Sequence, residues 1–549
     1  MNREKNLDTL LSSIKILEIS SPTLNPLIQN LVFDSRNVTK GSLFFALPGN
    51  TVHGNTFIQE AIKKGAVAII YQDEIPSSLI QTHAANIVMV KVQDSRYAMS
   101  PIADSFYDSP SSKLKVIGVT GTEGKSTTTY LIWQLIQLLG AKAGFISTVQ
   151  TSFGDRAFDN TEHLTTPEAP VIHYSLAKML ENNCEYAIIE SSSHGLSKKT
   201  NRCGDIHYDV GIVTNVTHEH LEFHGTREQY AFDKANLFRS LDLFSHEKTV
   251  LGLKSSVPTF GVINADDSVA FSFLEDTKQA CFFFSEKSSV PLKEQNIDSK
   301  AFFYASNIIS SEKQLSFTLT NENLTKQSVE VETNLIGTFN VHNILASIIT
   351  VSKIMGKSIE EVAKTCQKLI PVKGRMSSVD KGQNFEVIID YAHTPSSFNT
   401  IFPPIRDRAQ GKIISVFGSG GNRDTKKRPE QGAIAARYSD IVILTDEDPR
   451  TENSMDILTM IAEGCKNPYN FSVSRGTEVY CKADSTSLFL IPDRKKAIRK
   501  AFSLASKNDI VLLLGKAHEN SIIYADHIMP YDEIEEAISA LAEMGYKKG

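Results

Sequence analysis

The residues best suited to chemistry lie in segment 115–129, which reads KVIGVTGTEGKSTTT. A glycine turn before the pair Lys125-Ser126 is typical of a loop that binds phosphates through backbone N–H groups. Lys125 is suited to reach the terminal phosphates, and Ser126 is suited to ligate Mg²⁺. The residue five positions before Gly124 is Val119 rather than the usual first glycine. We therefore interpret the stretch as a variant phosphate cradle for ATP or GTP.

A strand and a helix must hold this cradle. The apolar, β-branched run 114–119 predicts a buried parallel strand, and apolar residues at helical spacing over 126–139 predict a helix. The positive end of that helix would face the phosphates. The alternative is a tight turn that carries a lysine by chance. The coincidence of strand, glycines, Lys-Ser pair and helix favours nucleotide binding.

Polar side chains also follow the ends of other predicted strands. Such positions bind ligands in open α/β sheets, so their recurrence predicts a site between two sheets. These segments are ESSSH (190–194) and the stretch from Asn215 to His220 in the middle of the chain, and DYAHTP (390–395), GSGGNRDTKKRP (418–429), TDEDPRTE (445–452) and GKAHE (515–519) towards its end.

Two of these segments offer metal ligands. Glu190 supplies oxygen and His220 supplies nitrogen, and both could serve a metal beside the phosphates. The alternative for Glu190 is a helix cap or a surface carboxylate, and for His220 a histidine with ordinary hydrogen bonds. Together with the cradle, metal ligation is the better interpretation of Glu190, and the two interpretations of His220 stay balanced.

The later segments offer cations on glycine- or proline-marked loops. Arg423, Arg428 and Arg450 are suited to bidentate recognition of carboxylates. Lys426 and Lys427 fit a solvated basic loop better. A nucleotide on one domain and carboxylate-binding arginines on another fit an ATP-dependent ligase. Such an enzyme phosphorylates a carboxylate and then lets an amine attack the acyl phosphate.

The composition sets limits on the class of protein. A chain of 549 residues is too long for one core, so we expect about three domains. They would span residues 1–110, 111–372 and 373–549. A net charge of −6 predicts no nucleic-acid or membrane partner. Six cysteines without paired spacing indicate reduced thiols and a cytoplasmic protein. Alternating residues over 281–331 predict an antiparallel patch.

The ordered motifs resemble the Mur ligase family. The resemblance covers essentially the whole chain and is closest to the branch that adds a diamino acid to UDP-N-acetylmuramoyl-L-alanyl-D-glutamate. It implies an α/β fold of three domains: a small UDP-binding α/β domain, a central P-loop ATPase domain with a mostly parallel sheet, and a C-terminal Rossmann-like domain. The motifs that carry it are DSR…GSLFFALPG, GVTGTEGKSTT, ESSSHGLS, TNVTHEHLEFHGT, FDKANLF, GTFNVHN, KGRM, DYAHTP, GSGGNRDTKKRP, DPRTE and GKAHE.

The resemblance also implies a role for individual residues. It implies catalytic roles for Lys125, Lys234 and His220. ATP would contact Thr120, Gly121, Thr122, Glu123, Gly124, Lys125, Ser126, Thr127, Asn340, Asn343, Arg375 and Asp390. Mg²⁺ would be held by Ser126, Glu190, His220 and a carbamylated Lys234. The UDP-muramoyl-peptide would contact Ser35, Asn50, Thr165, Thr166, Ser192, Ser193, Lys198 and Thr200. The amino acid would contact Arg423, Asp448, Pro449, Arg450, Gly515 and Glu519.

Several positions depart from the family pattern. Glu123 replaces an asparagine of the cradle and places a carboxylate near the γ-phosphate. Lys198 and Thr200 stand where glutamine and arginine often meet the substrate, and Arg202 is a candidate to compensate. Asp448 stands where diaminopimelate enzymes usually have asparagine. Leu164 replaces a polar residue, and Ala517 replaces a glycine.

The resemblance implies an ADP-forming ligase of cytoplasmic peptidoglycan precursor synthesis, with ATP and Mg²⁺. Its partners would be a UDP-muramoyl-dipeptide and a free diamino acid, and we expect a monomer. Arg450 suits the distal carboxylate of diaminopimelate, whereas Asp448 and Glu519 suit the distal ammonium of lysine or ornithine, so diaminopimelate is only slightly favoured. The alternatives are another branch of the family, a ligase of the folylpolyglutamate synthase kind, or a nucleotide switch that ligates nothing.

Overall fold

The computed structural model describes residues 3–49, 52–160, 164–217, 221–288, 298–311, 314–321, 328–465, 479–482 and 487–547. The chain folds into two compact units. The first consists of Met1–Ser285, Val290–Phe303 and Ala346–Val362, and the second of Glu286–Ser289, Tyr304–Leu345 and Ala363–Gly549. No helix among the described residues is long and apolar enough to cross a membrane.

The first unit begins with a small sheet covered by helices on both faces. Its strand order is β2-β7-β6-β5-β4, parallel except for β2. Alternation along β5 decides the two faces: Leu43 and Phe45 pack with α1 and α4, whereas Phe44 and Ala46 pack with α2. The elements are α1 (Leu7–Leu11), β2 (Ile16–Ile19), β4 (Asn30–Val32), β5 (Ser42–Ala46), α2 (Ile58–Lys64), β6 (Ala66–Tyr71), β7 (Val88–Val92) and α4 (Met99–Phe106).

A second, mostly parallel sheet holds the cradle. Within the first unit its strands follow the order β11-β10-β9-β12-β8-β13-β16-β17, and β9, β12, β8, β13, β16 and β17 are parallel neighbours. The register pairs Glu190 with Val119 and Val213 with Thr120, so three strands end beside the cradle. The elements are β8 (Lys115–Thr120), α5 (Lys125–Leu138), β9 (Ala143–Ile146), β10 (Gln150–Ser152), β11 (Ala157–Asp159), α6 (Ala169–Glu181), β12 (Tyr186–Glu190), β13 (Val210–Val213), α9 (Arg227–Ser240), β16 (Phe260–Asn264) and β17 (Ala280–Ser285).

The antiparallel patch begins later than the sequence predicts. Strand β17 pairs parallel with β16, which corrects the expectation for residues 281–285. The consecutive aromatic residues Phe283 and Phe284 are buried, as in a parallel strand that is covered on both faces. Strands β18 (Phe302–Ser310), β19 (Leu315–Thr320) and β20 (Ser328–Thr333) are antiparallel, as expected.

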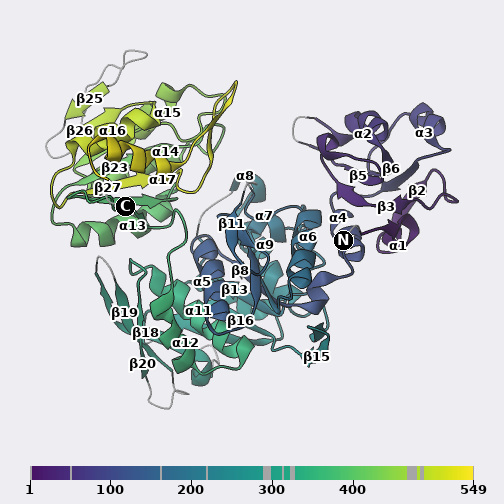
Figure 1. Cartoon of the computed structure of the whole chain (residues 1–549), viewed down its shortest axis with the longest axis horizontal. Coiled ribbons are helices and arrows are strands. Elements are labelled where there is room, and N and C mark those ends of the chain that lie inside the picture. Colours follow the sequence, from purple (N-terminus) through teal and green to yellow (C-terminus); the bar gives the residue numbers. More distant parts are fainter. Residues whose placement is uncertain are drawn as a thin grey trace. The chain divides into compact units, whose positions relative to one another are not determined.

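The end of the chain forms a doubly wound sheet in the second unit, drawn in green to yellow in Figure 1. Its order is β21-β22-β27-β23-β24-β26-β25, with five parallel central strands and antiparallel edges. Helices α13, α14 and α15 pack on one face, and α16 and α17 pack on the other. The elements are β21 (Ser377–Ser378), β22 (Glu386–Asp390), α13 (Pro395–Arg408), β23 (Ile413–Phe417), α14 (Lys427–Tyr438), β24 (Ile441–Leu444), α15 (Ser454–Gly464), β25 (Val479–Lys482), β26 (Ser487–Leu490), α16 (Arg494–Leu504), β27 (Ile510–Leu514) and α17 (Glu533–Glu543).

The predicted fold class is confirmed, because the chain has a small α/β sheet, a mostly parallel sheet with the cradle and a Rossmann-like sheet. The two compact units are discontinuous in sequence and therefore do not test a division into three domains. The expected domain boundaries at residues 110 and 372 stay predictions.

A buried lysine fastens the segment between the first two sheets of the first unit. The Nζ of Lys248 donates to the carbonyl oxygens of Ser111 (3.1 Å), Leu114 (3.0 Å) and His207 (2.7 Å) and to Oδ2 of Asp209 (2.6 Å). Burial lowers the pKa of Lys248, while Asp209 favours its charged form. The lysine therefore ties the residues around 111–114 to the hairpin of β14 (Glu247–Val250) and β15 (Leu253–Ser256).

Replacing this lysine tests its contribution to stability. Lys248→Met removes the buried lysine from Asp209 and leaves that carboxylate with His246 (3.0 Å) as a basic partner, so it should lower the free energy of unfolding by about 3 kcal/mol. Lys254→Met changes an exposed lysine of the same hairpin and should cost less than about 0.5 kcal/mol. Urea unfolding of the two variants measures the difference, and equal midpoints would contradict this role of Lys248.

Candidate active site

The cradle adopts a conformation that requires glycine at two positions. Gly121 has φ +147° and Gly124 has φ +82°. A Cβ at Gly121 would lie 1.9 Å from Oγ1 of Thr214, so no larger residue fits there. The side-chain oxygen of Asn215 accepts hydrogen bonds from the backbone N–H groups of Thr122 (3.2 Å) and Glu123 (2.8 Å). The residues that follow β13 thus hold the loop in shape.

The predicted phosphate ligand Lys125 and the predicted metal ligands Ser126 and Glu190 lie at the cradle. Lys125 donates to the carbonyl oxygen of Thr122 (2.7 Å), and Ser126 donates to Oε1 of Glu190 (3.0 Å). Glu190 is buried and also accepts hydrogen bonds from the backbone N–H and the hydroxyl of Thr148 (2.8 and 2.9 Å). A hydroxyl and a carboxylate are hard oxygen donors, so this pair fits Mg²⁺.

Lys234 reaches the cradle from helix α9. Its side chain is buried, its Nζ lies 4.5 Å from the centre of the Tyr230 ring, and it donates to the carbonyl oxygen of Gly121. The spacing of the sequence alone indicates only a lysine on a helix surface. The structure instead places it against the phosphate loop. His220 and Asn50 lie outside the described residues.

Thr166 and Ser192, two of the residues expected to meet the UDP-muramoyl-peptide, contact each other. The Thr166 hydroxyl donates to the carbonyl oxygen of Glu190 (2.8 Å) and accepts from the N–H of Ser192 (2.8 Å). Ser193 is hydrogen-bonded to Nε2 of His224 (3.0 Å). His224 also contacts Asp233, and the sequence motif contained this histidine without a role for it. Of the other expected contact residues, Ser35 begins a short 3-10 helix (Ser35–Asn37), and Thr165 and Lys198 lie in loops.

Arg202 holds the Thr166 loop. It donates to the carbonyl oxygen of Thr166 (2.9 Å) and to Oε1 of Glu168 (2.9 Å), which also accepts from Arg96 (2.8 Å). The hydroxyl of Thr200 donates to a backbone carbonyl within its own turn. Neither the Glu168 carboxylate nor its two arginines could be paired from the sequence, because these residues are far apart in the chain.

Four residues expected near the nucleotide belong to the second unit. Both carboxylate oxygens of Asp390 accept backbone N–H groups, from Ala392 (2.7 Å) and Met376 (2.8 Å), and burial raises its pKa. Asn340 and Arg375 line one cleft of about 640 Å³. Asn343 donates to the side-chain oxygen of Asn340 (3.0 Å). The roles of these residues stay predictions.

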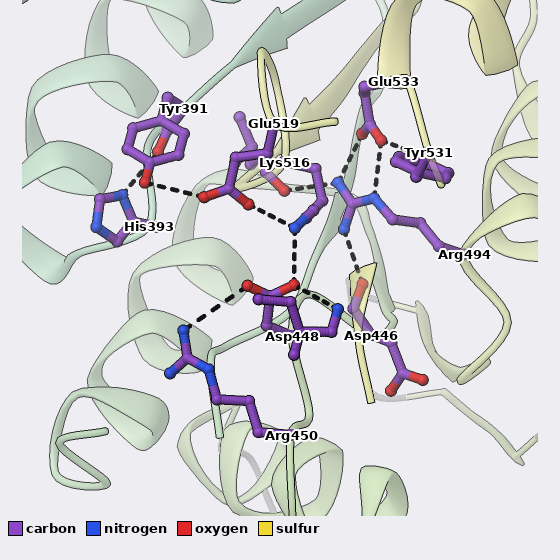
Figure 2. A network of polar contacts seen from close by, with 12 residues as sticks. Tyr391, His393, Asp446, Asp448, Arg450, Arg494, Lys516, Glu519, Tyr531 and Glu533 are labelled. Carbon is purple, nitrogen blue, oxygen red and sulfur yellow. Dashed lines mark hydrogen bonds and ion pairs between the residues drawn. The ribbon is translucent and has the colours of Figure 1, made fainter. Parts of the chain in front are cut away.

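The loops expected to contact the amino-acid substrate, here called the amino-acid loops, meet in a chain of charged groups (Figure 2). Lys516, which is buried, contacts Oδ1 of Asp448 (2.8 Å) and Oε2 of Glu519 (2.5 Å). Arg450 has φ +52°, lies 3.8 Å from Oδ2 of Asp448 and donates to the carbonyl oxygen of Gly421 (2.9 Å). All of these loops are recognisable in the sequence, but Lys516 was not predicted to belong to the site, although it stands in the GKAHE motif.

Two turns bring these loops close to one another. Gly515 has φ +98°, and a Cβ there would lie 3.1 Å from Oε2 of Glu447. A Cβ at Gly421 would lie only 1.9 Å from the carbonyl oxygen of Pro449. The backbone at Gly421 therefore approaches the DEDPR segment more closely than a side chain would allow, whereas Gly515 is favoured by its positive φ.

Two arginines of this part of the chain bind internal carboxylates. Arg428 is buried and donates to both oxygens of Glu452 (2.8 and 3.0 Å), which corrects its interpretation as a substrate-binding arginine. Arg494 is buried against Glu533 and donates to the carbonyl oxygens of Leu514 (2.8 Å) and Asp446 (3.2 Å). Arg494 thus fixes the ends of β27 and β24, from which the amino-acid loops emerge.

Arg423 remains exposed on its loop, as a substrate-binding arginine can be. Lys427 donates to the carbonyl oxygen of His393 (3.2 Å), so one lysine of this loop has an internal contact.

Three parts of the chain match described protein families. Residues 27–107 match the Mur ligase family, catalytic domain; residues 119–351 match the Mur ligase middle domain; and residues 374–517 match the Mur ligase, glutamate ligase domain.

Relatives match over nearly the whole chain. UDP-N-acetylmuramyl-tripeptide synthetase of Treponema denticola is 49% identical over 523 residues, 92% of this chain and 92% of the relative. UDP-N-acetylmuramoyl-L-alanyl-D-glutamate--2,6-diaminopimelate ligase of Geobacillus thermodenitrificans is 36% identical, with 94% of this chain and 96% of the relative covered.

Solved structures agree with these matches. A UDP-N-acetylmuramoyl-L-alanyl-D-glutamate--2,6-diaminopimelate ligase superposes with a TM-score of 0.57 at 26% identity, over 95% of this chain and 96% of the other. The MurF ligase of Thermotoga maritima in complex with ADP shares the fold, with a TM-score of 0.60 at 18% identity over 94% and 97% of the two chains. The chain therefore belongs to the Mur ligase family of ATP-dependent ligases, which form amide bonds in peptidoglycan precursor synthesis.

Proposed function

We propose that the enzyme joins a diamino acid to UDP-N-acetylmuramoyl-L-alanyl-D-glutamate with formation of ADP and phosphate. The observation that carries this proposal is the chain of Asp448, Lys516, Glu519 and Arg450 at the strand ends, which offers both signs of charge to a small zwitterion. Two relatives that match the chain over almost its full length support it: one is named a UDP-N-acetylmuramoyl-L-alanyl-D-glutamate--2,6-diaminopimelate ligase and the other a UDP-N-acetylmuramyl-tripeptide synthetase.

The cradle would provide the first half of the reaction. Lys125 and the N–H groups of the loop bind the phosphates of ATP, and Ser126 and Glu190 would hold Mg²⁺. Mg²⁺ neutralises phosphate charge during transfer. A carboxylate oxygen of the substrate attacks the γ-phosphorus and ADP leaves. The amine of the second substrate then attacks the acyl phosphate, its proton is lost, and inorganic phosphate is released.

The charges of the amino-acid loops narrow the choice of the second substrate. The negative charges of Asp448 and Glu519 are balanced by the positive charges of Lys516 and Arg450. Glu447 adds one more negative charge. Its Oε2 is buried and lacks a hydrogen-bond partner among the described residues. This surplus suits a distal ammonium. Diaminopimelate, lysine and ornithine all carry one, and diaminopimelate also offers a carboxylate to Arg450, which keeps it slightly ahead.

Membership of a ligase family removes the alternative of a nucleotide switch. A folylpolyglutamate synthase from Mycobacterium tuberculosis shares the fold over 77% of this chain at 14% identity, and this likeness carries no argument about substrate.

The direct test is ligation by the purified enzyme. With ATP, Mg²⁺ and UDP-muramoyl-dipeptide, we expect phosphate release and a tripeptide product with at least one of diaminopimelate, lysine and ornithine, and diaminopimelate to be slightly preferred. Mass spectrometry of the product identifies the amino acid. Phosphate release that ignores the amino acid, or activity only with neutral amino acids, would contradict the proposal.

Asp448 should control the choice among the three substrates. Asp448→Asn removes a negative charge but keeps an oxygen for Lys516 and for the N–H of Ile523. We expect the KM for lysine and ornithine to rise about 10-fold and the KM for diaminopimelate to change less, because Arg450 can then bind its distal carboxylate. Asp526→Asn, an exposed aspartate after β28 (Ser521–Ile523), is the matched control. An equal effect on all three amino acids would speak against this role.

Substitution of Lys234 tests its proposed role as a metal ligand. A carbamate would turn this buried lysine into an oxygen ligand, so Lys234→Ala should lower kcat by about 100-fold or more, which corresponds to roughly 3 kcal/mol. Bicarbonate or acetate should restore part of the activity. Lys278→Ala, at an exposed lysine of the same unit, should have no effect. Full activity of Lys234→Ala would rule out the carbamate.

A further inference from the structure

Tyr391 lies between the residues assigned to the nucleotide and those assigned to the amino acid. It directly follows Asp390 at the end of β22. Its ring centre lies 4.5 Å from that of His393 and 4.6 Å from that of His518, and the guanidinium carbon of Arg375 lies 4.8 Å from it. Three groups from separate loops therefore fix the orientation of the ring.

The hydroxyl of this ring points into the amino-acid cluster. It donates to Oε1 of Glu519 at 3.2 Å, while Oε2 of the same carboxylate accepts from Lys516 (Figure 2). Lys516 in turn contacts Asp448 at 2.8 Å. Glu519 is thus held at both oxygens, and among its side-chain donors in the described part of the chain the hydroxyl of Tyr391 is neutral whereas Lys516 is charged.

A neutral donor has a different effect on Glu519 from that of a second cation. It restrains the rotation of the carboxylate but leaves its negative charge in place. Burial and the nearby charges of Glu519 and Glu447 raise the pKa of Tyr391 well above its ordinary value, so the phenol remains a donor throughout the working pH range.

We propose that Tyr391 is a positioning residue of the amino-acid site: its hydroxyl presets Glu519 to receive the distal ammonium of the incoming diamino acid. Tyr391 itself contacts neither reacting atom. The inference rests on the proposed function, because Glu519 must face the amino acid. It also means that the loop after Asp390, which is expected to contact ATP, helps to set the affinity for the second substrate.

The variant Tyr391→Phe removes only the hydroxyl and keeps the ring between Arg375, His393 and His518. We expect the KM for the diamino acid to rise about 3- to 10-fold, as for a lost hydrogen bond to a carboxylate. The kcat and the KM for ATP should stay within about 2-fold. A merely structural role would instead change all three constants together, and steady-state kinetics separates the two cases.

The control is the same substitution at another buried hydroxyl. Tyr531 donates to Glu533, which pairs with Arg494 rather than with the amino-acid cluster. Tyr531→Phe should therefore lower the unfolding midpoint without raising the KM for the amino acid. A second comparison places Tyr391→Phe in a Glu519→Gln background, where it should add no further rise in KM because the charged acceptor is already gone.

The outcomes separate this inference from the proposed function. A wild-type enzyme that ligates no diamino acid overturns both. An active wild type with an unchanged KM in Tyr391→Phe overturns the inference alone. A rise of the same size in the Glu519→Gln background also overturns it, because the hydroxyl would then act through another group. A rise in KM that disappears in that background supports it.

Discussion

The loops of this protein depend on the pairing of buried cations with carboxylates and carbonyl oxygens. A buried charge is costly unless it is paired and hydrogen-bonded. Lys248 satisfies this requirement with Asp209 and three carbonyl groups, and Arg494 satisfies it with Glu533 and the ends of two strands. Removing either partner would leave a charge uncompensated, so each pair locks the loops that it joins.

The same requirement shapes the chemistry. Lys516 could not remain buried without Asp448 and Glu519, and those two carboxylates could not approach each other without Lys516. The result is a cluster that is already charged and oriented. A substrate with a distal ammonium would then meet carboxylates that need little reorganisation, which favours tight and selective binding.

Local patterns in the sequence predicted the elements but not the long-range pairs. The cradle and its flanking strand and helix are encoded within 115–139, and the structure confirms the strand and the helix there. Lys516 was missed although its motif was recognised, because nothing local shows that it meets Asp448. Arg428 looked like a substrate-binding arginine, yet it binds Glu452. The partners of Arg202 and Arg494 lie 34 and 39 residues away, beyond the reach of periodicity.

The sheets account for why the chemistry gathers where it does. Parallel strands end at one edge, so residues distant in sequence, such as Glu190 and Thr214, reach the same loop. The second unit uses this arrangement again, with Asp390, Asp448 and Glu519 following three strands of one sheet. Tyr391 joins two of these loops directly through its hydroxyl.

The central claim is that ATP activates a carboxylate of the UDP-muramoyl-dipeptide before the amine attacks. Substrate labelled with ¹⁸O in the D-glutamyl side-chain and α-carboxylates tests it most directly. If an acyl phosphate forms, ligation must transfer one ¹⁸O atom into each molecule of inorganic phosphate. Unlabelled phosphate accompanied by full tripeptide formation would contradict the account.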